Sequence, residues 1–127
     1  MAKRDLKGKV AWITGGGTGI GEGAGRALAA AGVHVVVSGR RAGPIEAVAA
    51  SIEADGGAAS AMPLDVADAN AVKAAAQALQ AKHGRLDILI NSAGINTKER
   101  RYANMSSESW RQVVDVNLSG VFHATQA

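Results

Sequence analysis

A glycine-rich loop between a predicted strand and a predicted helix limits the folds open to this chain more than any other feature. Residues 14–21 read TGGGTGIG, after the apolar run Lys9–Thr14 and before the helical pattern Ile20–Ala31. A sharp turn, close packing of the helix on the strand and close approach of a ligand to the backbone each exclude a Cβ atom. The loop therefore predicts the opening of a βαβ unit.

The same loop is suited to a dinucleotide. The N-terminus of the following helix would direct backbone N–H groups and a partial positive charge at a pyrophosphate. A Walker A loop is excluded, because no Gly-Lys-Ser or Gly-Lys-Thr follows. A turn with a purely structural role is the alternative.

Strand-like and helix-like periodicities alternate along the whole chain. The predicted strands are Lys9–Thr14, Val33–Ser38, Ala58–Leu64 and Leu86–Asn91. The predicted helices are Ile20–Ala31, one with Pro44 in its first turn, one from Asp68 to Gly84, and one that begins near Ser107. Short connections and right-handed crossovers then require a doubly wound parallel sheet with helices on both faces, in one α/β domain over residues 1–127.

Apolar spacing predicts which side of each helix faces the sheet. The expected inward residues are Ala27, Leu28 and Ala31 in the first helix, Ile45, Val48 and Ile52 in the second, and Val72, Ala75, Ala76 and Leu79 in the third. Asp68 is the expected N-cap of the third helix and Gly84 its end.

Composition excludes several classes of protein. The chain has no cysteine, so a disulfide scaffold, a cysteine-ligated zinc site and a thiol nucleophile are ruled out, and three scattered histidines do not predict a metal site. The net charge is +3, and the bases gather in an N-terminal arm with Lys3 and Arg4 and in Lys98–Arg101. Because no basic stripe with interleaved aromatics exists, no nucleic-acid partner is expected. The most apolar stretch, Ala27–Ser38, is too short to span a membrane, and no signal segment is recognisable, so a cytoplasmic location is expected.

The end of the second strand bears on cofactor choice. An NAD site usually places an acid there for the ribose 2′-hydroxyl, but this chain reads Ser38-Gly39-Arg40-Arg41. A guanidinium fits a 2′-phosphate in charge and in forked geometry, so NADP is favoured over NAD, with Arg40 the better candidate. Two solvated arginines in a surface loop are the alternative.

Four motifs in order resemble the short-chain dehydrogenase/reductase family. They are the TGGGTGIG loop, Leu64-Asp65-Val66 after the third strand, Asn91-Ser92-Ala93-Gly94 after the fourth, and Val114–Leu118 on the last helix. Ser92 stands where the family has a second Asn. The resemblance covers nearly all 127 residues and implies a Rossmann-type sheet of strand order 3-2-1-4, incomplete on its C-terminal side.

The resemblance also implies residue roles. Gly15, Gly17, Thr18, Gly19, Ile20 and Gly21 would surround the pyrophosphate; Asp65 would accept from the adenine amino group; the backbone of Val66 would contact the ring; and Asn91, Ala93 and Gly94 would line the ribose side. Asn91 would also brace the central sheet. Asn117 would hold a water in the proton relay of catalysis, as a polar residue on a mostly apolar helix; an exposed Asn is the alternative.

The family's catalytic Tyr-x-x-x-Lys is absent, since Tyr102 is followed four residues later by Ser106. The chain is therefore interpreted as the cofactor-binding half of an NAD(P)-dependent oxidoreductase of alcohols or ketones. Alone it is predicted to be inactive, with its fourth strand at an open edge and apolar residues of its last helix exposed. The intact protein is expected to be a homodimer or homotetramer. A stand-alone nucleotide-binding or interaction module is the alternative.

The remaining polar residues receive simpler interpretations. His34, His83 and Asp87 are expected at the surface, and His123 on the outer face of the last helix. Lys98–Arg101 are expected in a loop near the substrate entrance, either attracting an acidic substrate or solvated.

Overall fold

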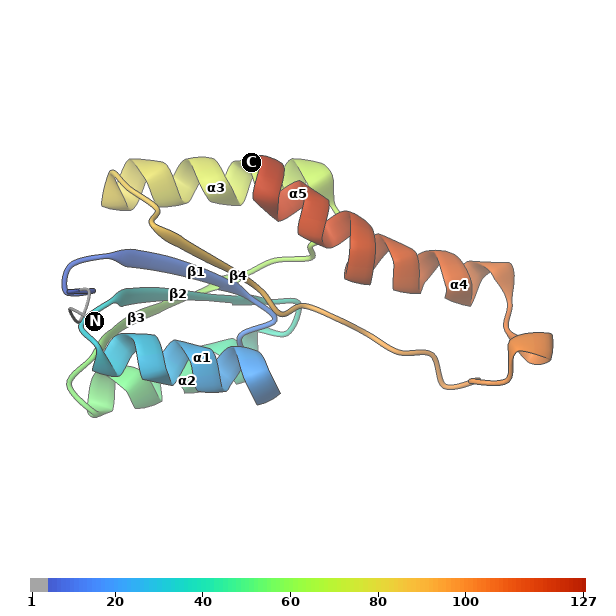
Figure 1. The fold of residues 1–127 in the computed structure, drawn as a ribbon, viewed down its shortest axis with the longest axis horizontal. Helices are drawn as coiled ribbons and strands as arrows, with labels where there is room; N and C mark the ends of the chain where they lie inside the picture. The colour runs from blue at the N-terminus through green and yellow to red at the C-terminus, as the bar shows by residue number, and fades with distance from the viewer. Residues whose placement is uncertain (1–4) are drawn as a thin grey trace.

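A four-stranded parallel sheet with helices on both faces forms the body of the protein, in a computed structural model that describes residues 5–127. The sheet has the order β3-β2-β1-β4, which confirms the predicted doubly wound arrangement (Figure 1). Lys3 and Arg4 of the basic N-terminal arm lie outside the described residues.

The elements follow the predicted alternation closely. The strands are β1 (Val10–Thr14), β2 (His34–Gly39), β3 (Ala58–Pro63) and β4 (Ile88–Asn91). The helices are α1 (Gly19–Ala30), α2 (Ala42–Ala54), α3 (Ala69–His83), α4 (Ser107–Val114) and α5 (Gly120–Gln126), with a short 3₁₀ turn at Tyr102–Asn104.

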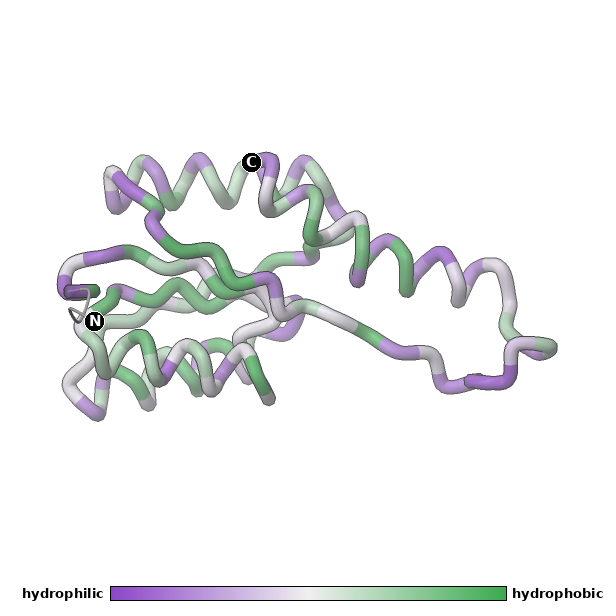
Figure 2. Tube along the Cα trace, viewed as in Figure 1, coloured by the Kyte–Doolittle hydropathy of each residue, from purple (hydrophilic) through white to green (hydrophobic). Residues whose placement is uncertain are grey.

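The two central strands are buried on both sides, because one layer of helices covers each face of the sheet (Figure 1). Ile13 and Val35 point toward α1 and α2, and Trp12 and Val36 point toward α3 and α5. Continuous apolar runs are what such strands require, and the hydropathy trace accordingly shows hydrophobic colour along the middle of the sheet (Figure 2).

Helix ends carry the signals expected from the sequence. The carboxylate of Asp68 accepts from the backbone N–H groups of Asn70 and Ala71, each at 3.0 Å. Gly84 ends α3 with a φ of 71°, a conformation that other residues adopt only with strain. The hydroxyl of Ser106 caps α4 by accepting from the N–H of Ser109 at 3.1 Å.

The inward face of α2 is as predicted, but that of α1 is only partly so, since Leu28 alone of its predicted residues packs against the core. Ala27 and Ala31 are exposed, and the buried positions are Gly21, Gly25 and Ala29. A Cβ on Gly25 would lie 3.3 Å from Cδ1 of Ile13, so the missing side chain lets α1 pack closely on β1. Apolar spacing overlooks such a face because glycine has no apolar side chain to count.

The predicted single helix after Ser107 is interrupted. A π-helical turn, η2 (Asp115–Ser119), joins α4 to α5. The apolar side chains Trp110, Leu118 and Phe122 are 55%, 68% and 59% exposed along this segment. Within residues 5–127, no helix is both long and apolar enough to cross a membrane.

Of three residues expected at the surface, Asp87 is exposed whereas His34 and His83 are half-buried, and all three make specific contacts. The rings of His34 and His83 pack together with centroids 4.5 Å apart, and both Nε2 atoms are buried without a hydrogen-bond partner. Asp87 accepts from the backbone N–H of Val10 at 2.9 Å and pairs with Arg85. The hydrogen bond from Arg85, and then the one from Val10, holds the pKa of the Asp87 carboxyl well below its usual range.

Candidate functional site

A cavity of about 410 Å³ opens where the carboxyl ends of β1, β2, β3 and β4 meet. In open α/β sheets this edge is where ligands bind, because successive loops diverge there. Eight of the residues predicted to bind a cofactor line the cavity: Gly15, Gly17, Thr18, Arg40, Asp65, Val66, Ala93 and Gly94.

The glycine loop brings β1, α1 and β4 close together. Gly15 has a φ of 66°, and a Cβ there would lie 2.5 Å from backbone atoms of Ser92 and Ala93. The N–H of Gly16 donates to the carbonyl of Ser38 at 3.0 Å, which ties the loop to β2. Only a glycine permits the contact at Gly15, which joins the loop to the segment after β4 and was not among the predicted reasons for the glycines.

The start of α1 beside the cavity lacks a side-chain cap. Thr18 is the N-cap residue, but its side chain makes no capping hydrogen bond, so the first-turn N–H groups remain available to an anion. Gly19, Ile20 and Gly21 form this first turn and do not line the cavity, and the side chain of Ile20 is exposed.

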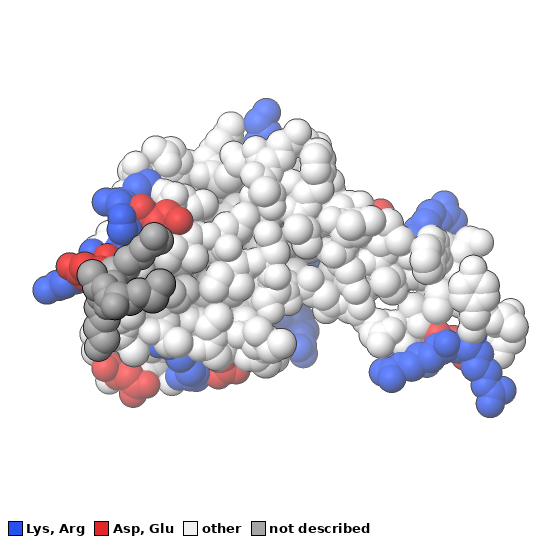
Figure 3. Space-filling view, in the orientation of Figure 1, with Lys and Arg blue, Asp and Glu red and all other residues white. Residues whose placement is uncertain are grey.

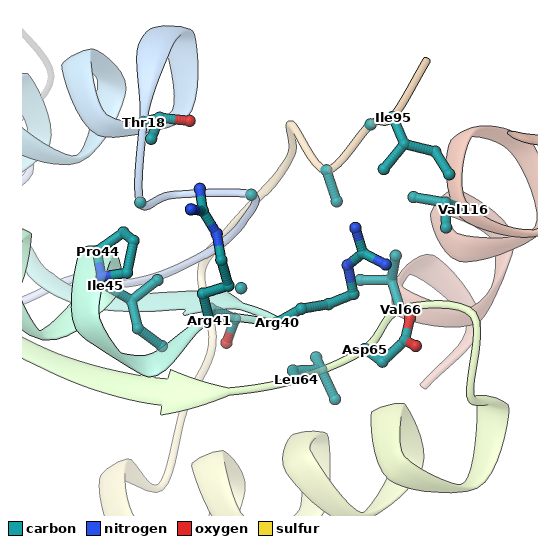
Figure 4. Close-up of a pocket in the computed structure, with 16 residues that line it drawn as sticks. Thr18, Arg40, Arg41, Pro44, Ile45, Leu64, Asp65, Val66, Ile95 and Val116 are labelled. Carbon is teal, nitrogen blue, oxygen red and sulfur yellow. The ribbon is translucent and has the colours of Figure 1, made fainter. Parts of the chain in front are cut away.

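Two arginines project into the cavity from the loop after β2 (Figure 4). Arg40 extends toward Asp65 and Val66, whereas Arg41 extends toward Thr18 at the glycine loop. In the part of the chain that the structure describes, neither forms an ion pair. Both positive charges are therefore available to an anionic ligand.

The turn after β3 forms the opposite wall. The carboxylate of Asp65 accepts from the N–H of Ala67 at 3.0 Å through one oxygen, Oδ1. The carbonyl of Val66 lies 2.8 Å from Nδ1 of His123 on α5. His123 thus packs against the site, and its predicted place on the outer face of the helix was wrong.

The loop after β4 is held by the last helical segment. Oδ1 of Asn117 accepts from the N–H of Ile95 at 2.8 Å, and its Nδ2 donates to the carbonyl of Ile95 at 2.9 Å. Asn117 lies in the π-helical turn and close to Gly94, but it does not line the cavity. Asn91 lies outside the lining too, and its Nδ2 donates to Oγ1 of Thr125 at 3.3 Å.

Part of the lining carries no recognisable signal in the sequence. Pro44, Ile45, Leu64, Ile95 and Val116 give the cavity apolar walls. Their apolar patterns are the same as those of core residues, so the sequence does not distinguish a cavity wall from packed interior. Among residues 5–127, no group of three or more His, Asp or Glu side chains is arranged to hold a metal ion.

Comparison with known proteins agrees with the family resemblance of the sequence motifs. A family model described as short chain dehydrogenase matches residues 9–127. The chain is 35% identical over 127 residues to the 2,3-dihydro-2,3-dihydroxybenzoate dehydrogenase of Bacillus subtilis, covering 100% of this chain and 48% of that protein.

Solved structures agree with this match. A metagenomic short-chain oxidoreductase in complex with NADP superimposes with a TM-score of 0.92 at 33% identity, over 96% of this chain and 55% of that one. A 3-ketoacyl-(acyl-carrier-protein) reductase from Brucella melitensis complexed with NADH gives 0.87 at 39% identity, over 95% and 48%. The chain spans about half the length of these relatives.

Proposed function

The chain belongs to the short-chain dehydrogenase family, and from this premise we propose that its cavity binds NADP for hydride transfer to or from an alcohol or ketone. The observation that carries the proposal is the joint lining of one cavity by the glycine loop, the Asp65–Val66 turn and two arginines that form no ion pair with any of residues 5–127. NAD is the alternative cofactor, since one similar structure holds NADH.

Each side of the cavity, together with the neighbouring start of α1, would face one part of the dinucleotide. The N–H groups at the start of α1 would bind the pyrophosphate, and Arg40 would bind the 2′-phosphate. The free oxygen of Asp65 would accept from the adenine amino group, beside the backbone of Val66. The apolar side chains of Leu64, Ile95 and Val116 suit the faces of a planar base.

The reacting end of the cofactor would lie toward the loop after β4. Ala93 and Gly94 would line the ribose there, while Asn117 holds the backbone of Ile95 in place. When bound, the nicotinamide supplies the hydride transfer. Asn91 and Asn117 would lie next to this end of the cofactor. Asn117 would hold a water molecule in a proton relay.

The intact protein tests the proposed reaction. NADPH consumption is followed by the absorbance of the reduced nicotinamide with a panel of ketones, and NADP reduction with the matching alcohols. Turnover with at least one pair is expected, and the 127 residues alone, which contain no Tyr-x-x-x-Lys, are expected to give none. Turnover by a preparation verified to contain only these residues would contradict the proposal that they bind the cofactor but do not catalyse the reaction alone.

The proposal includes the oligomeric state of the intact protein. The exposed side chains of Trp110, Leu118 and Phe122 lie on the segment that begins at Ser107, and they favour pairing of subunits through it. A homodimer or homotetramer is therefore expected for the intact protein, and sedimentation equilibrium measures its mass directly.

A further inference from the structure

His123 makes a contact with the candidate site that sequence analysis did not predict. Its half-buried ring lies on α5 with Nδ1 2.8 Å from the carbonyl oxygen of Val66, which is 57 residues away in sequence. A carbonyl oxygen only accepts, so Nδ1 must carry the proton and donate. The ring does not line the cavity itself.

The turn that receives this bond is short and already organised from within. Asp65 accepts from the N–H of Ala67, and the N–H of Asp68 donates to the carbonyl of Asp65 at 3.1 Å. The N–H of Leu64 donates to the carbonyl of Gly39 at 2.9 Å, which fixes the start of the turn on β2. The bond from His123 fixes its far side, at Val66.

A glycine one helical turn earlier permits the contact. A Cβ on Gly120 would lie 2.6 Å from Cγ2 of Val66, so α5 approaches the turn closely only because Gly120 has no side chain. Positions three apart lie on the same side of a helix. Gly120 and His123 therefore present one surface of α5, shaped to the side chain and the carbonyl of Val66.

We infer that His123 is a positioning residue for adenine recognition, an inference that rests on the proposed nucleotide site. By holding the carbonyl of Val66, it sets the direction of the peptide backbone and of the Asp65 carboxylate that face the base. Adenine offers an amino group and a ring nitrogen acceptor on that edge, whereas hypoxanthine offers a carbonyl oxygen and an N–H. A well-fixed turn discriminates between these two patterns, and a loose turn does so poorly.

The test measures base selectivity in the intact protein. Dissociation constants for NADPH and for its hypoxanthine analogue are determined by calorimetry for the wild type and for His123→Leu and His123→Asn. We expect the wild type to prefer NADPH. In His123→Leu the ratio of the two dissociation constants is expected to fall about tenfold, the upper range for one hydrogen bond. His123→Asn places an N–H near the position of Nδ1 and is expected to keep the preference.

A merely structural role for His123 gives a different pattern. Loss of general stability would weaken both nucleotides equally and leave the selectivity ratio unchanged, which would overturn the inference. So would an unchanged ratio with unchanged affinities. His123→Ala is a second variant in case the leucine does not fold, with the same expected loss of selectivity. Failure of the wild type to bind either nucleotide would overturn the proposed function itself, a result distinct from any change confined to the variants.

Discussion

Two adjacent arginines after β2 face different parts of the cavity, and this difference predicts different effects on substitution (Figure 4). A guanidinium–phosphate hydrogen bond contributes about 1.5–3 kcal/mol, so Arg40→Ala is expected to weaken NADPH binding roughly 10- to 100-fold. NADH lacks the 2′-phosphate and is expected to bind with nearly unchanged affinity. Calorimetric titration with both cofactors measures the two changes.

Arg41→Ala is the matched control, since it removes the same charge from the neighbouring position. Its guanidinium points to the glycine loop, so its loss is expected to weaken both cofactors to a similar extent. If Arg40→Ala weakened NADPH and NADH equally, Arg40 would not contact the 2′-phosphate.

The His34–His83 pair predicts an acid-sensitive stability. Burial lowers the pKa of both imidazoles, with Lys82 lowering both further, while His83 lowers and Glu53 raises that of His34. In an unfolded chain a histidine has a pKa of about 6.5, so below that pH the unfolded state binds more protons than the folded state. The contribution of the pair is therefore complete above about pH 6.5 and is lost progressively below it.

Urea unfolding across this range measures the effect, with His34→Val as the comparison because valine continues the apolar run of β2. The variant is expected to show a flatter dependence of unfolding free energy on pH. An equal slope in the two proteins would mean that the pair does not contribute.

Local pattern and motif predicted which residues would gather at the cavity, but they did not predict contacts between residues distant in sequence. Arg40 was singled out by its position at the end of a strand and Asp65 by the family resemblance, and both line the cavity. Asp87 contacts Val10, 77 residues away, and His123 contacts Val66, 57 residues away. No spacing in the sequence indicates such pairs, because they are brought together only by the order of the strands.

At the scale of single elements, the cap of α3 gives a clean test of a confirmed prediction. Asp68 accepts two backbone hydrogen bonds at the start of the helix, and Asp68→Ala is expected to lower the free energy of unfolding by about 1 kcal/mol. Urea denaturation measures the change. Asp55→Ala removes the same charge at the C-terminal end of α2, where the helix dipole disfavours it, and is expected to cause no loss. Equal losses in both variants would show that charge, not capping, explains the effect.

The π-helical turn was beyond sequence reasoning for a physical reason. A π turn inserts one extra residue into a helix and requires no particular residue type, so the run from Val113 to Phe122 has the appearance of an ordinary helix. The turn nevertheless contains Asn117, whose side chain holds Ile95 beside the cavity. The family motif singled out this position, whereas the π-helical backbone around it became visible only in the structure.

At the scale of the whole molecule, topology follows from few rules. Parallel strands are joined by right-handed crossovers, and strands covered on both faces are apolar. The order of the strands could therefore be predicted from the alternation of strands and helices together with the family resemblance. The place of the cavity could be predicted as well, because it lies where the strands end. Its apolar walls could not be, since they have the same composition as the core.

Charged side chains are sparse over the middle of one face of the molecule (Figure 3). Figure 3 shows charged side chains mainly toward the two ends of the visible face, with mixed signs near the start of the chain and bases near the tip of the loop after β4. This face presents no continuous basic stripe of the kind that nucleic acids require.

Hydrogen exchange of the intact protein with and without NADPH tests most directly whether the cavity is the cofactor site. If it is, exchange is expected to slow in the four segments that border the cavity, residues 15–21, 38–41, 64–67 and 92–95. The hollow between α1 and α2 around Arg26 and Asp55 serves as an internal control that stays unchanged. Absence of protection at the four segments, or protection confined to that second hollow, would show that the cavity is not the cofactor site.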